Sequence, residues 1–469
     1  MLNIVKTRNS MKRVFVSVFF VLVAMIMNAQ DIAGHWGGTL NIQGMKLRLV
    51  FHVSRSGDSW TTTMDSPDQG AKGIPTGKTE YADSVLTITA PALGMKFSGK
   101  WQGTDRIQGT FVQGGLTLPL ELTRGNEEKS PLRPQEPKPP YPYRVEEVTF
   151  ENTKAGVTLA GTLTLPEKGD HYPVVVLISG SGPQNRDEEI LGHKPFLVLA
   201  DHLTRQGIGV LRFDDRGVGQ STGNFETATT LDFADDVEAA VRFLKNDRNV
   251  RNIGLIGHSE GGMIAPLVAS RSGDVSFIVL LAGPGLRGDH ILLEQQKEMG
   301  RVTGATAGEL DYSAAVNRRC FDIVLASASS REAEPLLKAY MDSLNQAGKL
   351  PVNMKDERGA ELWRRQVLSP WMYFFVKYDP VPVLRDVKCP VLALKGSNDL
   401  QVLPENLGII KKGLEAGRNR NVTVKELPGL NHLFQTCESG SPALYGTIEE
   451  TFSPVALKEI GDWIKGKGF

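Results

Sequence analysis

The sequence predicts an α/β fold, in which a mostly parallel sheet is flanked by helices, preceded by a small all-β, barrel-like domain. Three observations carry this prediction. Over residues 145–469, short apolar runs alternate with helix-forming segments, which is typical of βαβ units. Residues 31–125 instead contain closely spaced strand-like runs separated by glycine-rich turns. Residues 126–144, between them, are rich in proline and charge and predict an extended linker.

Bulk composition agrees with a two-domain globular protein. The chain has 469 residues, a length that favours two domains, and its hydrophobic content of 41% is ordinary for a protein with a large core. Its 53 basic and 53 acidic residues leave no net charge, which disfavours nucleic acid and anionic membrane surfaces as partners.

Residues 1–29 have the pattern of a signal peptide. Lys12 and Arg13 precede an apolar run over 14–27, and Ala29 marks a plausible cleavage site. The run is short for a membrane span, so we expect no stable span after signal removal. The sequence therefore predicts an exported protein, periplasmic or secreted. A retained N-terminal anchor is the alternative.

Cysteine and histidine usage predicts neither a disulfide scaffold nor a metal site. The mature chain holds Cys320, Cys389 and Cys437, an odd and low number. None of them has the spacing of a Cys/His metal site. We therefore expect no metal and no cofactor.

The N-terminal domain is expected to be built from short strands, with candidates at 46–53, 85–88 and 116–122. It also holds three of the six tryptophans, Trp36, Trp60 and Trp101. They are interpreted as core residues of a small barrel. A platform for a glycan or another ligand is the alternative.

The second domain contains buried-strand patterns at 174–178, 209–213, 252–256, 275–281, 390–396 and 422–426. Helices are expected at 195–203 and 231–244. About a hundred residues, roughly 285–386, separate two of the strands and are rich in helix formers, which predicts a helical cap.

A candidate nucleophile lies between a strand and a helix in the second domain. Gly257-His258-Ser259-Glu260-Gly261 follows an apolar strand and precedes a helix of small residues. This is the setting of a nucleophile elbow, a strained turn that exposes a serine hydroxyl above the sheet. Ser221 lies in a second G-x-S-x-G match, but in a loop with no strand before it and no helix after it, so it is interpreted as structural.

A serine nucleophile needs a base, and the base needs an orienting acid. In the fold with this elbow the acid and then the histidine follow the serine along the chain. His432 follows the last predicted strand, whereas the other histidine beyond Ser259, His290, begins the cap. Asp399 directly follows the strand at 390–396 and is favoured over Asp379, which precedes that strand.

Backbone donors for the oxyanion are expected at two turns. One is the N–H of Glu260, the residue after the nucleophile. The other is the N–H of Ser181, in the glycine-rich turn after the strand at 174–178, with Gly182 as the next choice.

Four residues are candidates for contacting substrate. They are Gly182 of the oxyanion turn and three aromatic residues of the late cap segment, Trp371, Phe374 and Phe375. The aromatic segment lines an acyl pocket in one interpretation and forms the core of the cap in the other.

These motifs, taken together, resemble the α/β-hydrolase superfamily, especially bacterial carboxylesterases related to the dienelactone-hydrolase and serine-aminopeptidase-like groups. The resemblance covers about residues 145–469 and rests on the elbow and on the segments 180–187, 214–221, 396–399 and 431–432. It implies an α/β-hydrolase fold and bracing roles for Arg186, Asp187 and Arg216. Many relatives carry His-Gly where this chain has Ser179-Gly180, which removes a loop-stabilising side chain. The N-terminal β-domain is similar to those of exported bacterial hydrolases.

The predicted function is hydrolysis of short-acyl carboxylic esters, small molecules, through a Ser-His-Asp acyl-enzyme mechanism. A serine peptidase or aminopeptidase with the same three residues is the alternative, with Glu294, Glu298 and Glu309 of the cap available to hold a free ammonium. A catalytically inert protein whose β-domain binds a glycan or a partner is a further alternative. The residues leave the acyl group, the alcohol and the oligomeric state open.

Overall fold

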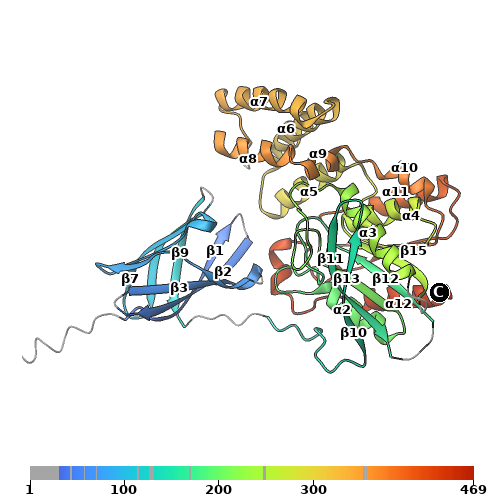
Figure 1. The fold of residues 1–469 in the computed structure, drawn as a ribbon. Coiled ribbons are helices and arrows are strands. Elements are labelled where there is room, and N and C mark those ends of the chain that lie inside the picture. Colours follow the sequence, from blue (N-terminus) through green and yellow to red (C-terminus); the bar gives the residue numbers. More distant parts are fainter. Residues whose placement is uncertain are drawn as a thin grey trace, which may run out of the picture. The chain divides into compact units, whose positions relative to one another are not determined.

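The fold was analysed in a computed structural model, which describes residues 31–469 except 43–44, 58, 70, 114–115, 126–130, 168, 170, 247–249, 352–353 and 355. The predicted signal peptide, residues 1–29, and residues 126–130 of the predicted linker lie outside the described residues. Contacts divide the chain after Lys129 into two compact units, which are described separately (Figure 1).

The described part of the first unit is a closed sheet. Its strand order is β2-β1-β9-β8-β7-β6-β5-β3, and β2 also pairs with β3, so the ring returns on itself; β4 pairs with β3 outside the ring. The strands are β1 (Gly34–Ile42), β2 (Met45–Ser56), β3 (Ser59–Ser66), β4 (Ala71–Pro75), β5 (Thr79–Ala82), β6 (Val85–Ala90), β7 (Met95–Gln102), β8 (Arg106–Gln113) and β9 (Leu116–Arg124). The predicted small all-β, barrel-like domain is confirmed.

Two tryptophans lie in the core of this barrel. Trp36 is fully buried and Trp101 nearly so, and their rings meet edge to face at 5.0 Å. The Trp36 Nε1–H donates to the Ile32 carbonyl, so its polar atom is satisfied inside. Trp60 is partly buried against the same cluster. The tryptophans therefore stabilise the barrel, and Trp36 and Trp101 are not part of an exposed ligand platform.

The second unit is built on a mixed sheet in the order β10-β11-β13-β12-β14-β15-β16-β17. The pairs β10–β11 and β11–β13 are antiparallel, and the pairs from β13 to β17 are parallel. The strands are β10 (Tyr143–Asn152), β11 (Val157–Pro166), β12 (Tyr172–Ile178), β13 (Gly209–Phe213), β14 (Val250–His258), β15 (Val275–Leu281), β16 (Val391–Gly396) and β17 (Val422–Leu427). The central parallel strands are buried on both faces, which explains their continuous apolar composition.

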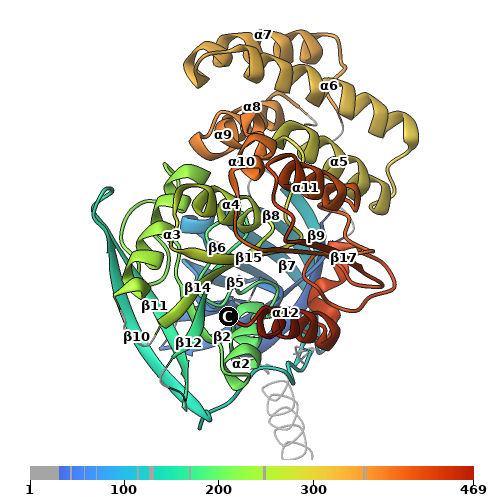
Figure 2. The same ribbon diagram turned by 90° about the vertical axis from the view of Figure 1, so that its right-hand side faces the viewer.

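Helices cover both faces of this sheet and enclose two hydrophobic clusters (Figure 2). On one face lie α3 (Thr230–Lys245), α4 (Gly261–Arg271), α10 (Pro380–Asp386) and α11 (Glu405–Ala416). On the other face lie α2 (Pro195–Arg205) and α12 (Pro454–Gly466). The predicted α/β fold is thereby confirmed.

A helical cap is inserted between β15 and β16. Its helices are α5 (Gly288–Val302), α6 (Ala307–Ala326), α7 (Ser330–Gln346), α8 (Glu357–Val367) and α9 (Pro370–Lys377). They enclose a core of their own, which includes Phe321, Leu337 and Val376. α10 also lies within the predicted insertion, but it packs on α11 and α4 over the sheet, so the cap itself ends with α9.

Among the described residues, no helix combines the length and apolar character that a membrane crossing requires.

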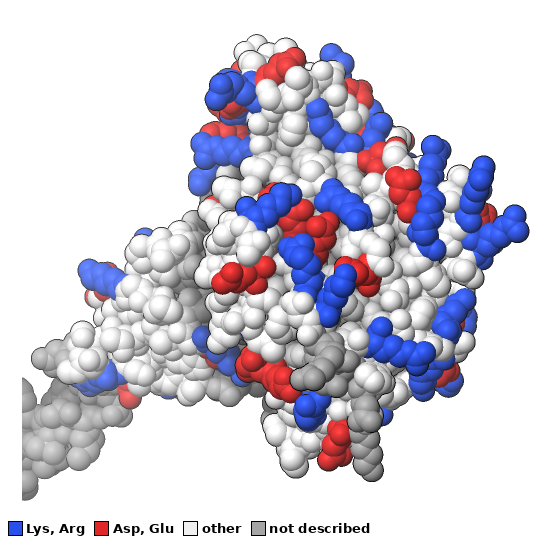
Figure 3. Space-filling view, turned by 45° about the vertical axis from the view of Figure 1, so that its right-hand side comes forward, with Lys and Arg blue, Asp and Glu red and all other residues white. Residues whose placement is uncertain are grey.

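On the face seen in Figure 3, lysine and arginine side chains are interspersed with aspartate and glutamate.

Candidate active site

Ser259 occupies a strained turn between β14 and α4. Its φ of +52° is in the left-handed region, which a non-glycine residue adopts only when the surrounding structure holds it there. The Ser259 N–H donates to the Leu281 carbonyl of the neighbouring strand at 2.8 Å. A Cβ on Gly257 would lie 2.0 Å from the Gly261 carbonyl oxygen, and one on Gly261 would lie 2.2 Å from that of Ile178. The two glycines of the motif are therefore required by close backbone approaches.

The structure brings Ser259, His432 and Asp399 into one hydrogen-bonded chain. The Nε2 of His432 lies 3.1 Å from the Ser259 Oγ, and its Nδ1 lies 3.0 Å from the Asp399 Oδ2. The other carboxylate oxygen of Asp399 accepts the backbone N–H groups of Gln401 and Val402 at 2.8 and 3.0 Å. The three residues follow β14, β17 and β16, so this chain forms at the carboxyl edge of the parallel strands.

A buried lysine lies behind the Asp399 carboxylate. The Nζ of Lys395 lies 3.7 Å from the Asp399 Oδ2 and has no hydrogen-bond partner, and burial lowers its pKa to about 8. Burial alone would raise the pKa of Asp399, but His432 and Lys395 together hold it below its usual range. For His432, burial lowers the pKa; Asp399 opposes this shift, and His258 and Lys395 add to it, so the net shift is downward.

The lowered pKa of His432 predicts an acidic limb in the rate profile. His432 accepts a proton only when it is neutral, so activity is present above its pKa and is lost as the pH falls through it. Because that pKa lies below the ordinary histidine value of 6.5, kcat/KM should fall only below about pH 6.5. Ester hydrolysis measured between pH 4 and 8 tests this. A limb centred above pH 7 would contradict it.

Replacing Lys395 by Met should move this limb to higher pH. The substitution removes a positive charge that lowers the pKa of His432, and Met fills a similar volume. Profiles of kcat/KM against pH for the wild type and Lys395→Met provide the measurement. Lys412→Met, an exposed lysine on α11, is the control and should leave the limb in place. An equal limb in all three proteins would refute a role for Lys395.

The predicted oxyanion turn lies beside the nucleophile. A Cβ on Gly180 would lie 3.1 Å from the Cβ of Ser259, which shows how closely the turn approaches. The N–H of Gly180 donates to the Glu188 Oε1 at 2.7 Å, so it points away from an oxyanion. Ser181 and Glu260, the two predicted backbone donors, both line the pocket at Ser259.

A buried pair, Glu188 and His258, holds several parts of the site together, and the sequence did not predict it. The same Glu188 Oε1 that binds Gly180 lies 2.9 Å from the His258 Nδ1, and the His258 Nε2 lies 2.9 Å from the His432 carbonyl oxygen. Burial opposes the charged form of His258, but Glu188 raises its pKa overall. The pair joins the oxyanion turn, the elbow and the loop of His432. In the sequence, the only indication of this pair was that His258 directly precedes the candidate nucleophile.

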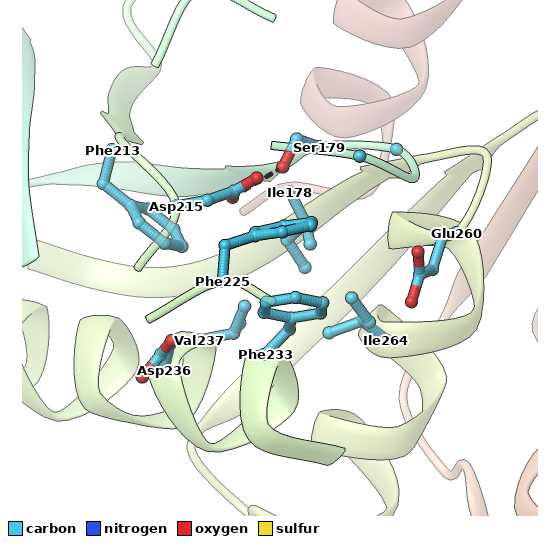
Figure 4. Close-up of a pocket in the computed structure, with 12 residues that line it drawn as sticks. Ile178, Ser179, Phe213, Asp215, Phe225, Phe233, Asp236, Val237, Glu260 and Ile264 are labelled. Carbon is cyan, nitrogen blue, oxygen red and sulfur yellow. Dashed lines mark hydrogen bonds between the residues drawn. The ribbon is translucent and has the colours of Figure 1, made fainter. Parts of the chain in front are cut away.

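Ser179 is also part of the support of this turn. Its Oγ donates to the Asp215 Oδ1 at 2.9 Å, and the Gln184 N–H donates to the other Asp215 oxygen at 2.9 Å (Figure 4). Burial raises the pKa of Asp215 to about 8. Ser179 and Asp215 therefore brace the loop.

The side chain of Glu260 links the elbow to the cap. Its Oε1 accepts the Trp371 Nε1–H and the Thr230 hydroxyl, both at 2.8 Å, and Ser181 adds a further hydrogen bond. It also borders a small chamber of about 20 Å³ below the oxyanion turn, room for roughly one water molecule (Figure 4). Gly182 lines this chamber, not the larger pocket.

The three residues expected to brace loops do so. Arg186 binds the Asp214 carboxylate at 2.8 Å, Arg212 forms a close ion pair with Asp187, and Arg216 binds Asp236 at 2.7 Å. Ser221, in the second G-x-S-x-G match, donates to the Asp214 carbonyl at 2.7 Å and accepts the Ala160 N–H at 3.0 Å. Its hydroxyl is therefore used in the fold.

A pocket of about 430 Å³ opens at Ser259 and His432, within the size range of small-molecule sites. The cap lines it with Trp371 and Phe375, two of the aromatic candidates. Phe374 is not among its described lining residues, and packs on Tyr378 with ring centroids 5.5 Å apart.

The chain is similar to several known proteins. Esterase EstD of Thermotoga maritima is 25% identical over 359 residues, which cover 76% of this chain and 77% of that protein. Among solved structures, the esterase Pf2001 of Pyrococcus furiosus is 18% identical, with a TM-score of 0.41, covering 69% of this chain and 93% of its own. Est1E of Butyrivibrio proteoclasticus, solved with ferulic acid, is 16% identical, with a TM-score of 0.41, covering 68% and 98%.

The family model described as serine aminopeptidase, S33 (Hydrolase_4) matches residues 194–436, which include Ser259, Asp399 and His432. The predictions of an α/β-hydrolase and of a hydrolytic enzyme are thereby confirmed. Because the match spans more than half of the chain, this protein belongs to the serine aminopeptidase S33 family of α/β-hydrolases.

Proposed function

We propose that the protein hydrolyses short-acyl carboxylic esters with Ser259 as nucleophile, His432 as base and Asp399 as the acid that orients the histidine. The observation that carries this proposal is the unbroken chain from the Ser259 Oγ through the imidazole to the Asp399 carboxylate, with distances of 3.1 and 3.0 Å. EstD, the curated relative, is named an esterase.

The geometry supports a two-step reaction. His432 removes the proton of the Ser259 hydroxyl as the oxygen attacks the ester carbonyl, and the N–H groups of Glu260 and Ser181 stabilise the oxyanion. The alcohol leaves with a proton from His432, which produces the acyl-enzyme. Water, deprotonated by His432, then releases the carboxylic acid. Asp399 keeps the Nδ1–H of the imidazole in place throughout.

The acids of the pocket favour esters over peptides with a free amino terminus. An aminopeptidase needs a carboxylate with an open acceptor for the ammonium. Glu188 and Glu260 line the pocket, and the Oε1 of each is already engaged by two groups of the protein. None of the three cap acids considered for this role is among the described lining residues: Glu298 pairs with Arg301 at 2.9 Å, Glu309 caps α6, and Glu294 holds a buried Oε2 without a hydrogen-bond partner, outside the lining.

The experiment pairs a fluorophosphonate label with nitrophenyl esters and aminoacyl anilides. We expect labelling of Ser259 and fastest turnover of short esters. Preferred turnover of the anilides would instead make the protein an aminopeptidase, and no labelling would remove the proposed nucleophile.

We also propose that the mature protein is exported to the periplasm or beyond, on the basis of the pattern at residues 1–29. Fractionation of the producing cell, with N-terminal sequencing of the mature chain, tests this. A cytoplasmic protein with an intact N-terminus would refute it.

A further inference from the structure

The pocket at Ser259 contains an unusual number of side-chain amides. Five glutamines line it, and they come from four separate segments: the oxyanion turn, α5, α8 and the loop after β16. They are Gln184, Gln295, Gln296, Gln366 and Gln401. Each amide carries two N–H donors and an oxygen with two lone pairs, so the lining offers both donors and acceptors to a ligand.

Part of this lining is held in place by its own hydrogen bonds. The Gln295 Nε2 donates to the Gln401 Oε1 at 3.1 Å, and the Gln401 Nε2 lies 3.5 Å from the Tyr445 hydroxyl. Burial raises the pKa of Tyr445, so its hydroxyl stays protonated. These contacts use only part of the hydrogen-bonding capacity of Gln295 and Gln401. The two amides therefore form a prepared polar wall with open donors and acceptors.

The pocket also has an apolar side, and two elements contribute both to it and to the amides. On α5, Ile291 and Leu292 belong to an apolar cluster with Phe375 and Val402, whereas Gln295 and Gln296 follow one turn later on the same face.

The turn after β16 repeats this division. Gln401 lies on the polar wall and Val402 in the apolar cluster, and the backbone N–H groups of both bind Asp399. The division into two sides is therefore anchored to the residue that orients the base.

The lining offers little to a charged ligand. Among the described lining residues there is no lysine, arginine or aspartate. The Oε1 of each of the two glutamates is engaged by two groups of the protein, and the ring nitrogens of His258 are engaged by Glu188 and by the His432 carbonyl. A phosphate or a free carboxylate would find no lysine or arginine partner among these residues, and its entry would carry a high desolvation cost. A neutral ligand with many hydroxyl groups would instead satisfy the amides.

We propose that the substrate is a short-acyl ester of a neutral ring sugar, with the acyl group on the apolar side and the sugar hydroxyls on the amide wall. This inference rests on the proposed ester hydrolysis at Ser259. A ring sugar carries hydroxyl groups around its whole edge and therefore suits amides that converge from four segments. The volume of about 430 Å³ exceeds the needs of a short acyl group alone.

The test compares three acetate esters that differ in their alcohol: a methyl pyranoside carrying one acetyl group, cyclohexyl acetate, and glycerol monoacetate. Nitrophenyl acetate reports on ester hydrolysis itself. We expect kcat/KM for the pyranoside ester to exceed that for cyclohexyl acetate by at least about tenfold, because a site built for hydroxyls rejects the analogue that lacks them. Glycerol monoacetate should fall between them.

Gln295→Leu should lower the pyranoside-to-cyclohexyl ratio of kcat/KM by about tenfold, the effect of one lost hydrogen-bonding group. Gln346→Leu, an exposed glutamine at the end of α7, is the matched control and should leave the ratio unchanged.

The outcomes separate this inference from the proposed function. Equal or faster turnover of cyclohexyl acetate, with nitrophenyl acetate hydrolysed, would overturn the sugar assignment and leave the esterase intact. Faster turnover of glycerol monoacetate than of the pyranoside ester would also overturn it, in favour of an acyclic polyol. No hydrolysis of any ester would overturn both.

Discussion

Ser259→Ala should lower kcat for nitrophenyl acetate by roughly four orders of magnitude or more and abolish fluorophosphonate labelling, because it removes the attacking oxygen. The melting temperature should change little, because the substitution removes the hydrogen bond between the Ser259 Oγ and His432 but leaves the Cβ in place. Single-turnover kinetics, labelling and thermal unfolding of the purified variant provide the measurements.

The chain supplies a matched control in its second G-x-S-x-G match. Ser221→Ala should keep full activity and labelling but lose about 1 kcal/mol of stability, because the Ser221 hydroxyl bonds the Asp214 carbonyl and the Ala160 N–H. Labelling that survives in Ser259→Ala, or disappears in Ser221→Ala, would reject the assignment of the nucleophile.

Asp399→Asn should lower kcat by about ten-thousand-fold while KM changes little. The amide of Asn would donate to the His432 Nδ1, so the imidazole would carry its proton on Nε2, facing the Ser259 Oγ, and could no longer accept one. The backbone contacts of Gln401 and Val402 can persist on the Asn carbonyl oxygen, so the loop should keep its form. Pre-steady-state kinetics should show slow acylation.

Asp379→Asn is the control for this variant, because Asp379 was the rival acid on sequence grounds. In the structure Asp379 caps α10 by accepting the Val381 N–H at 3.0 Å, a role that Asn fills equally well. The variant should match the wild type in kcat and in melting temperature. A large loss of kcat here, with near-normal Asp399→Asn, would move the acid to Asp379.

The residue types and their positions along the chain were enough to predict the fold class and the three residues of the hydrogen-bonded chain. Each of these residues follows a strand, and the strand pattern is readable because a parallel sheet buried on both faces demands continuous apolar runs. The carboxyl ends of such strands meet at one edge, so residues far apart in sequence could be expected to converge there. The glycines of the elbow, Gly257 and Gly261, could also be predicted, because the tight turn that requires them is a local feature of the sequence.

The support of the site depended on side chains whose partners lie far away in sequence. Glu188 meets His258 across 70 positions, and nothing in either local pattern specifies that pairing. Lys395 reads in sequence as a strand residue, and only the packed structure places its Nζ behind the Asp399 carboxylate.

For the aromatic segment of α9, the sequence likewise did not show which side of the helix faces the pocket. Trp371 and Phe375, four residues apart, lie on one side of the helix and line the pocket together with Met372, whereas Val376 is fully buried in the core of the cap. The segment therefore contributes both to the lining of the pocket and to the core of the cap, and an acyl-binding role stays a prediction. The sequence by itself determined the fold class, the elbow and the order of serine, acid and base, because these follow from local pattern and strand ends. Only the tertiary structure decided which side chains line the pocket, because that depends on how the inserted helices pack over the sheet.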